Sequence, residues 1–133
     1  MVTLNPDGPA CRMKIKTKRV YDPVEPEDGT RILVDRIWPR GMTKDRVHAD
    51  LWLKEAAPST ALRKWFGHDG ARWNAFKERY FSELDGKPQI AERLFGFLEK
   101  GTVTLLFSAI DTRRNQAVAL SEYLISRHSG QKN

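Results

Sequence analysis

The sequence predicts a small three-layer α/β domain, in which a short, mainly parallel sheet of about three strands is flanked by about five helices. Residues 32–34 and 102–107 are short, branched apolar runs of the kind that a sheet covered on both faces buries. About 60 residues with helical periodicity separate these runs, and a connection of that length fits a right-handed crossover between parallel strands. Residues 13–21 alternate charged with less polar side chains and predict a further strand.

The length of the chain, 133 residues, fits one domain, which we place at residues 13–127 between tails at 1–12 and 128–133. The hydrophobic share of 40% and the charged share of 30% are those of an ordinary soluble globular protein. No apolar run approaches the roughly 18 residues of a membrane span, and the N-terminus lacks the apolar centre of a secretory signal. The single cysteine, Cys11, cannot form an internal disulfide. We therefore expect a cytoplasmic protein without a membrane partner.

The segment after the first strand, residues 22–30, is predicted to be a loop because it contains Pro23, Pro26 and the pair Asp28-Gly29. It is shorter than the dozen or so residues that a helical crossover takes. The first two strands are therefore joined either as a wide hairpin or by a loop that crosses over in place of a helix. The direction of the first strand stays open.

Two helices are predicted directly after the second strand. Thr43 is a suitable cap for a helix over residues 44–56. After Pro58, Ser59 or Thr60 caps a short helix, and Gly67 is its expected end.

Three longer helices follow. Aromatic and apolar residues share one face over residues 71–85, and a second amphipathic stretch covers 88–100 and ends at Gly101. The last helix is expected at residues 113–127, after the third strand.

A cluster of charged and aromatic residues follows the second strand. Asp35 and Arg36 interrupt its apolar run, and Trp38, Arg40 and Gly41 come next in a segment that turns. Ligands of open α/β sheets usually bind at the carboxyl ends of the strands. This cluster is therefore the candidate site.

The third strand also ends in polar residues, and because parallel strands end at one edge of a sheet, the two clusters are expected to meet there. Ser108 follows this strand, and the next helix supplies free N–H groups and a positive dipole end that suit an anion. Arg113 and Arg114 add guanidinium groups that suit a phosphate or carboxylate. The candidate ligand-binding residues are Arg36, Trp38, Arg40, Gly41, Ser108, Asp111, Arg113 and Asn115.

Two carboxylates of this region each have two interpretations. Asp35 is a candidate catalytic base or a partner for a ribose hydroxyl. Alternatively, it pairs with Arg36 or Arg40 and fixes the loop, since buried charges are normally paired. Asp111 either contacts the ligand or only caps the last helix.

Several familiar kinds of site lack support in the sequence. Ser108 resembles a catalytic nucleophile by position alone, because His48, His68 and His128 are scattered along the chain. No pair of His or Cys residues has metal-ligand spacing, and both Gly-rich nucleotide signatures are missing. We therefore expect neither a metal nor a cofactor. Trp38 is interpreted as a core or pocket-wall residue rather than a base-stacking platform.

Four segments of the chain carry a resemblance to a known family. They are Lys-Arg-Val-Tyr-Asp at 18–22, Arg-Ile-Leu-Val-Asp-Arg-Ile-Trp-Pro-Arg-Gly at 31–41, Pro-Ser-Thr-Ala-Leu-Arg at 58–63 and Leu-Leu-Phe-Ser-Ala at 105–109. Together they resemble the YeaO-like family, small bacterial domains of unknown function, over about residues 13–127. The resemblance implies a compact α/β domain with a short parallel sheet, and it supplies no established activity.

The resemblance also bears on the start of the last helix. Larger related domains carry a Cys-His-Arg-like segment there, and by resemblance Asn115-Gln116 occupies its position. YeaO-like proteins usually have Asn-His at this place, whereas this chain has Gln116. The resemblance therefore gives no support to a histidine acid or base at this position.

The net charge of +6, from 23 basic and 17 acidic residues, favours anionic partners. The first hypothesis is a domain that binds a nucleotide or phosphorylated metabolite at the carboxyl edge of the sheet. The sequence leaves open whether the protein is an enzyme. If it is one, hydrolysis or group transfer at a phosphate or glycosidic centre is the expected reaction. The alternative is a non-enzymatic nucleic-acid or protein-interaction module with a basic face made of Lys14, Lys16, Lys18 and Arg19. In a third interpretation the Asp35–arginine cluster is purely structural.

Overall fold

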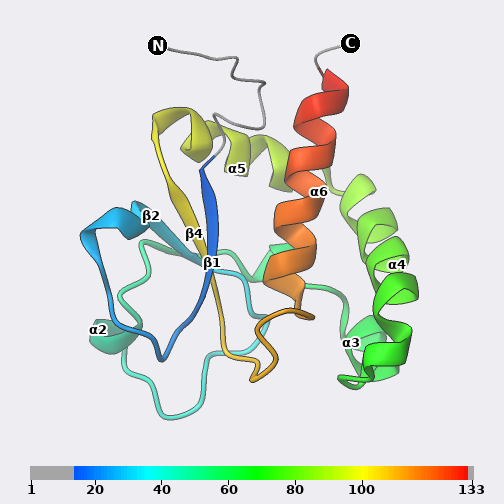
Figure 1. Ribbon diagram of the computed structural model, residues 1–133, viewed down its shortest axis with the longest axis horizontal. Coiled ribbons are helices and arrows are strands. Elements are labelled where there is room, and N and C mark those ends of the chain that lie inside the picture. Colours follow the sequence, from blue (N-terminus) through cyan, green and yellow to red (C-terminus); the bar gives the residue numbers. More distant parts are fainter. Residues whose placement is uncertain (1–13, 132–133) are drawn as a thin grey trace.

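The computed structural model describes residues 14–131, so the expected tail at 1–12, with Cys11, lies outside the described residues. The fold is α/β, as predicted, with one more strand than expected (Figure 1). The sheet has the order β1-β4-β2-β3, and all three neighbouring pairs are parallel. The strands are β1 (Ile15–Arg19), β2 (Thr30–Leu33), β3 (Leu51–Trp52) and β4 (Val103–Phe107).

The direction of the first strand, which the sequence left open, is parallel to the others. β1 and β2 pair with the two sides of β4, so that Thr17 and Ile32 both face Leu105 in the register. The segment between them contains only the short 3-10 helix η1 (Pro26–Asp28). A loop therefore crosses over β4 in place of a helix, and the hairpin alternative is wrong.

The expected helix over residues 44–56 is wrong beyond its first turn. Thr43 caps α2 (Lys44–Val47) as predicted, but the helix ends at His48, whose φ of 51° is left-handed. The chain then forms β3, where Trp52 pairs with Leu33, and the 3-10 helix η2 (Lys54–Ala56). Here the free edge of β2 offers backbone partners, and this tertiary pairing overrides the helical spacing of the apolar residues.

The remaining helices follow the expected order. They are α3 (Thr60–Phe66), α4 (Trp73–Asp85), α5 (Pro88–Lys100) and α6 (Gln116–Gln131), with the 3-10 helix η3 (Gly70–Arg72) before α4. Ser59, not Thr60, caps α3, and Gly67 ends it with a φ of 53°. The start of α6 at Gln116 is later than the predicted residue 113, and the helix continues to Gln131. No helix within residues 14–131 is long and apolar enough to cross a membrane.

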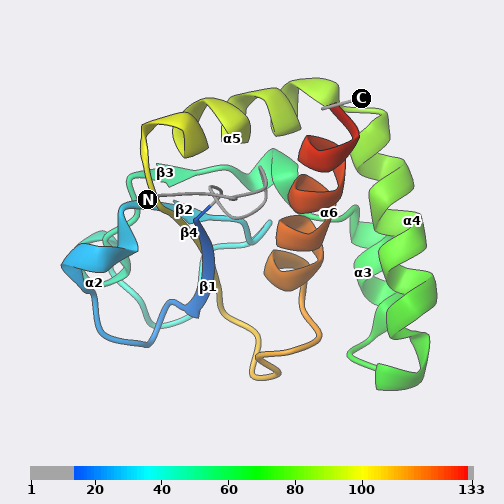
Figure 2. The ribbon, with the colours of Figure 1, turned by 45° about the horizontal axis from the view of Figure 1, so that its top comes forward.

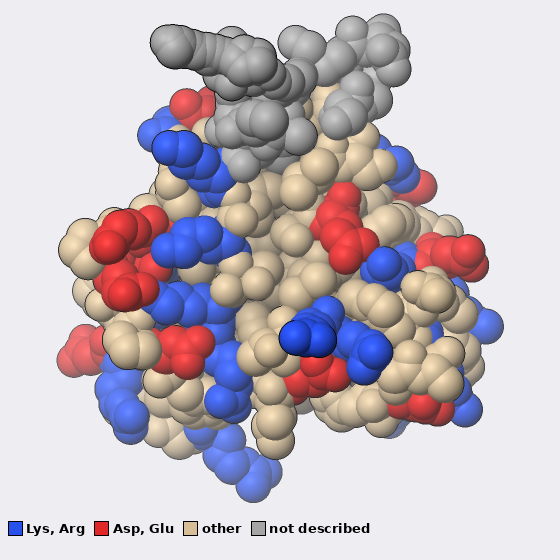
Figure 3. Space-filling view, viewed as in Figure 1, with Lys and Arg blue, Asp and Glu red and all other residues tan. Residues whose placement is uncertain are grey.

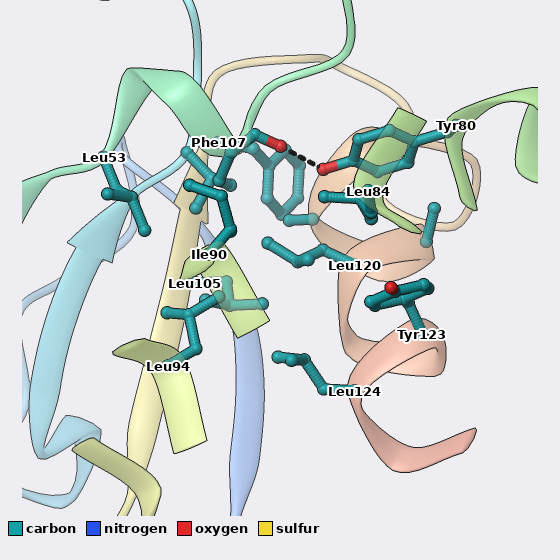
Figure 4. Close-up of a cluster of buried hydrophobic side chains, with 14 of the residues drawn as sticks. Leu53, Tyr80, Leu84, Ile90, Leu94, Leu105, Phe107, Leu120, Tyr123 and Leu124 are labelled. Atoms are coloured by element: carbon teal, nitrogen blue, oxygen red, sulfur yellow. Dashed lines mark hydrogen bonds between the residues drawn. The ribbon is translucent and has the colours of Figure 1, made fainter. Parts of the chain in front are cut away.

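The two faces of the sheet are covered differently. The helices α3, α4, α5 and α6 lie on one side of the sheet (Figure 2). Their buried side chains form one core with Val103, Leu105 and Phe107 of β4. Figure 4 shows this core, in which the buried hydroxyl of Tyr80 donates a hydrogen bond to the carbonyl of Ala56. A smaller core on the opposite face contains Leu33, Leu106 and Val47 of α2, together with Val20 and Met42. The second face is therefore closed by α2 and loops, which form a thin third layer.

A polar cluster completes the thin layer. The carboxylate of Asp28, fully buried, accepts hydrogen bonds from Lys16, Lys18 and Arg31. Its backbone carbonyl accepts a hydrogen bond of 2.7 Å from the hydroxyl of Thr104. One residue of the crossover loop thus ties together β1, β2 and β4.

Candidate functional site

The two polar strand ends meet at one edge of the sheet, as predicted. Leu33 of β2 and Leu106 of β4 are register partners, so the residues that follow them leave the sheet side by side. The hydroxyl of Ser108 donates to Oδ2 of Asp35 at 2.6 Å, and the Ser108 N–H donates to the same oxygen at 3.1 Å. The parallel connection inferred from the sequence therefore does place Asp35 against Ser108.

The other oxygen of Asp35 contacts the last helix. The side-chain amide of Gln116, the first residue of α6, donates to Oδ1. Asp35 is only 7% exposed, and burial raises its pKa above the usual value. The Ser108 and Gln116 hydrogen bonds and the charge of Arg63 lower the pKa, but by less than burial raises it. The carboxylate is therefore held by neutral donors.

The alternative in which Asp35 pairs with an arginine is wrong. The guanidinium of Arg36 donates to the backbone carbonyl of Pro58 at 3.2 Å and lies within 3.5 Å of that of Ala57. Arg40 is exposed, and no salt bridge joins Asp35 to either arginine within residues 14–131. The Asp35–arginine cluster is thus not an ion-pair network.

Beside Asp35 lies a cavity of about 290 Å³, which we call the strand-end cavity. Its walls combine apolar and basic groups. The apolar lining is Ile37, Ala57, Pro58, Phe66, Phe76 and Ala109, and the basic lining is Arg36, Arg63, Lys64, His68 and Arg114. Asp35, Ser108, Asn115 and Gln116 complete the wall. Among the predicted site residues, Asp35, Arg36, Ser108 and Asn115 therefore come together around one cavity.

The other predicted ligand residues do not line this cavity. Trp38 donates its indole N–H to the carbonyl of Met42 at 2.7 Å and packs edge-on against Trp52, with ring centroids 5.3 Å apart. Gly41 lies in a turn with a φ of 77°. Arg40 and Arg113 are exposed and away from the lining. Trp38 is thus a packing residue, as its core interpretation predicted.

The turn before α6 assigns separate tasks to Asp111 and Asn115. Oδ1 of Asp111 accepts from the N–H groups of Arg113 and Arg114, and these bonds lower the pKa of Asp111. Oδ1 of Asn115 accepts from the N–H of Val118 at 3.0 Å, which is the contact of a helix cap. Asp111 therefore caps the turn in front of the helix, and Asn115 caps α6 itself.

The contribution of α3 to the cavity was not predicted from the sequence. Arg63 and Lys64 lie on its exposed side, and Phe66 of the same helix is buried at 6% exposure. Nothing in the local spacing says that this side faces the strand ends. His68, one of three histidines that are scattered along the sequence, also lines the cavity, with a left-handed φ of 60°. Across the described part of the chain, no group of three His, Cys, Asp or Glu side chains is placed to hold a metal ion.

The basic face predicted along β1 is partly paired with acidic residues in the fold. Lys18 forms salt bridges of 2.8 Å with Glu25 and 3.0 Å with Asp28, and Lys16 pairs with Asp28 at 3.3 Å. Arg19 donates to the carbonyl of Ala109. Figure 3 shows acidic side chains interleaved with basic ones on the β1 side of the molecule. Much of this charge is therefore compensated within the fold.

Comparisons with known proteins place the chain among relatives of unknown function. The matching family model is described as the inactive DUF488-N3 subclade and covers residues 14–133. The uncharacterised protein YeaO of Escherichia coli (strain K12) is 46% identical over 114 residues, which are 86% of this chain and 99% of the relative. The uncharacterised protein Rv3073c of Mycobacterium tuberculosis (strain H37Rv) is 37% identical over 114 residues, 86% of this chain and 96% of the relative. No solved structure matches the chain significantly. The YeaO-like resemblance is thereby confirmed.

Proposed function

Because this chain belongs to the inactive DUF488-N3 subclade, we propose that it binds a small anionic molecule in the strand-end cavity without converting it. The observation that carries the proposal is the set of basic side chains around the cavity, Arg36, Arg63, Lys64 and Arg114. Within the described residues, none of the four forms a salt bridge. Cations that converge on a cavity and form no salt bridge favour an anionic ligand.

The chemistry of the buried polar groups supports binding rather than catalysis. The side chain that donates to Oδ1 of Asp35 is the amide of Gln116, and an amide neither gains nor releases a proton near neutral pH. The hydroxyl of Ser108 donates its hydrogen bond to Asp35, and within residues 14–131 no hydrogen bond links Ser108 to His68. An imidazole base, the usual activator of a serine nucleophile, is therefore missing from this arrangement.

A second candidate function rests on the 2.6 Å contact between the Ser108 hydroxyl and Asp35. A buried carboxylate with a raised pKa is a possible proton acceptor, which would make Ser108 the nucleophile of a hydrolase or transferase. The test is hydrolysis of 4-nitrophenyl phosphate and 4-nitrophenyl acetate by the wild type and by Ser108→Ala. Equal background rates support binding alone, whereas a rate lost in Ser108→Ala supports this second function.

The alternative of a nucleic-acid or protein-interaction module has less support. Its basic row is engaged by Glu25 and Asp28 within the fold, and partly neutralised lysines give weaker attraction to a polyanion. Under this alternative, replacing the row would abolish a salt-sensitive affinity for nucleic acid. Under our proposal, the row is dispensable for binding a small anion.

The proposed function is tested by calorimetry and thermal shift with phosphate, sulfate, sugar phosphates and nucleotides. A ligand that binds the native state alone raises the melting temperature with its concentration. We expect the double variant Arg63→Ala/Lys64→Ala to lose at least tenfold in affinity, since charge-assisted hydrogen bonds are worth roughly 1.5–3 kcal/mol each.

Two single variants serve as controls for the loss of a cation outside the cavity. Arg40→Ala removes a cation from the same edge of the sheet, outside the cavity lining, and Arg93→Ala removes an exposed cation from α5. Both should bind as the wild type does. Equal losses in all variants, or binding of no anion by the wild type, would reject the proposal.

A further inference from the structure

The strand-end cavity differs in chemical character between its buried side and its exposed side. Phe66 and Phe76 are buried, at 6% and 2% exposure, whereas Arg63, Lys64 and Arg114 are exposed. The buried part of the lining, which we call the inner end, therefore presents an aromatic wall beside Asp35 and Asn115, and the exposed cations form a basic mouth. A ligand that satisfies both ends has an apolar part that enters first and a charged part that stays near solvent.

The inner end presents a firm aromatic surface. The rings of Phe66 and Phe76 are stacked, with centroids 4.4 Å apart, and Trp73 packs against both at 6.0 Å and 5.7 Å. Tyr80, which is fixed by its hydrogen bond to Ala56, stacks on Phe76 in turn. Rings held on several sides keep their orientation, so they offer a fixed apolar contact to a flat or branched ligand group.

Asp35 reinforces the same orientation. It is 7% exposed on the cavity wall, and a second anion close to it would be repelled strongly because the surroundings are poorly hydrated. Oδ2 already accepts two hydrogen bonds from Ser108, while Oδ1 accepts one from Gln116. A carboxylate oxygen can accept two, so Oδ1 has room for one neutral hydroxyl or N–H donor of a ligand.

The volume limits the size of the ligand. A cavity of roughly 150 Å³ already holds a benzene ring, and small-molecule sites run from roughly 300 to 1,000 Å³. The strand-end cavity, at about 290 Å³, lies at the lower limit. It holds one ring or a branched chain together with one anionic group, and it is too small to enclose a base, a sugar and several phosphates.

We propose that the ligand is a small organic acid, a phosphate monoester or carboxylate, whose compact apolar body lies on Phe66 and Phe76 and whose single anionic group is held at the mouth by Arg63, Lys64 and Arg114. This inference rests on the proposed anion binding and narrows it. The expected ligand is then a small amphiphilic acid rather than a nucleotide. Asp35 has the role of excluding the anionic group from the inner end.

The test is a ligand series on the wild-type protein, measured by calorimetry at constant ionic strength. The probes are inorganic phosphate, methyl phosphate, phenyl phosphate, benzyl alcohol and adenosine triphosphate. We expect phenyl phosphate to bind at least tenfold more tightly than methyl phosphate, and benzyl alcohol and the nucleotide to bind more weakly than phenyl phosphate. Equal affinity for methyl and phenyl phosphate, or tightest binding of the nucleotide, overturns the inference while anion binding stands. If none of the probes binds, both the inference and the proposed function are rejected.

One variant separates the loss of cavity volume from the loss of the cations at the mouth. Ala109 is half-buried in the cavity wall, and Ala109→Leu fills space there without removing a cation. It should weaken phenyl phosphate at least tenfold and leave inorganic phosphate unchanged, whereas Arg63→Ala/Lys64→Ala should weaken both. Equal losses of the two ligands in Ala109→Leu would contradict the orientation. The melting temperature of each unliganded variant shows whether it is folded, and the wild-type series decides the proposal even if one is not.

Discussion

The side-chain amide of Gln116 donates a hydrogen bond to Asp35 across a separation of 81 residues, and this contact joins the start of α6 to the end of β2. The same carboxylate holds Ser108 after β4. One buried acid thus fixes three segments that surround the strand-end cavity. Its main role, on this geometry, is to organise the edge of the sheet.

Removal of the Gln116 amide should therefore destabilise the fold. In Gln116→Ala, Oδ1 of Asp35 loses its recorded partner while the carboxylate stays largely buried, and we expect the free energy of unfolding to fall by about 1–3 kcal/mol. The measurement is urea unfolding at neutral pH. Gln89→Ala is the matched control, since Gln89 also lies in the first turn of a helix but is exposed. A loss no greater than that of the control would contradict the role given to Gln116.

Titration of Asp35 should make the free energy of unfolding depend on pH. Because burial raises the pKa of this carboxyl, its contribution to stability is complete below the ordinary value of 3.8 and is lost as the pH rises through the raised value. The wild type should therefore lose stability relative to Asp35→Asn as the pH rises from about 4 towards neutrality. Urea unfolding of both proteins across this range measures the difference. A difference that stays flat, or that moves the other way, would show that the hydrogen bonds outweigh burial.

Titration of Asp28 should change the stability in the opposite direction, so that stability falls as the pH is lowered. Burial alone would raise its pKa, but the Glu25 N–H and the cations of Lys18, Lys16 and Arg31 hold the pKa well below the usual range. The stabilisation is present above the ordinary value of 3.8 and is lost as the pH falls below it. At neutral pH, Asp28→Asn leaves buried Arg31 without its carboxylate, and we expect a loss of about 3–5 kcal/mol.

The control for this prediction lies in the same cluster. Glu25 also pairs with Lys18, but its side chain is 53% exposed, so Glu25→Gln should cost less than about 1 kcal/mol. Unfolding of both variants by urea at pH 7 compares a buried pair with an exposed one. Similar losses would mean that burial of Asp28 contributes little.

The contact between Asp35 and Ser108 was predictable from the sequence because it follows from the direction of the strands. Two apolar runs separated by a long helical segment imply parallel strands, and parallel strands bring Asp35 to Ser108. No feature beyond run length and connection length was needed. The same reasoning left β1 open, because a short loop is compatible with either direction until β4 is available as a partner.

The parts that were missed depend on contacts between distant segments. Leu51 and Trp52 fit the apolar side of a helix, and only the free edge of β2 makes them a strand. The place of α3 depends on Glu83 of α4, which accepts hydrogen bonds from the N–H and hydroxyl of Ser59. That contact fixes the start of α3, the helix that carries Arg63, and no local periodicity encodes it.

The crossover loop provides the last prediction, which concerns Gly29. Its φ of 64° is left-handed, and a Cβ atom there would clash with the backbone carbonyl oxygen of Thr102. That oxygen also accepts the N–H of Thr30 at 2.9 Å, where β2 begins beside β4, so it cannot move away without loss of the pairing. We therefore expect Gly29→Ala to cost more than about 3 kcal/mol of stability, because a backbone clash adds to the left-handed strain.

Gly41→Ala separates the backbone clash from the left-handed strain. Gly41 has a φ of 77°, but within residues 14–131 no heavy atom beyond its two chain neighbours lies within 4 Å of a Cβ atom built on it. Only the conformational cost remains, and we expect about 1–2 kcal/mol. Thermal and urea unfolding of the two variants side by side measure the contrast. Equal losses would mean that Thr102 yields to the new methyl group, and that the close approach of the crossover loop to β4 is not what requires a glycine at position 29.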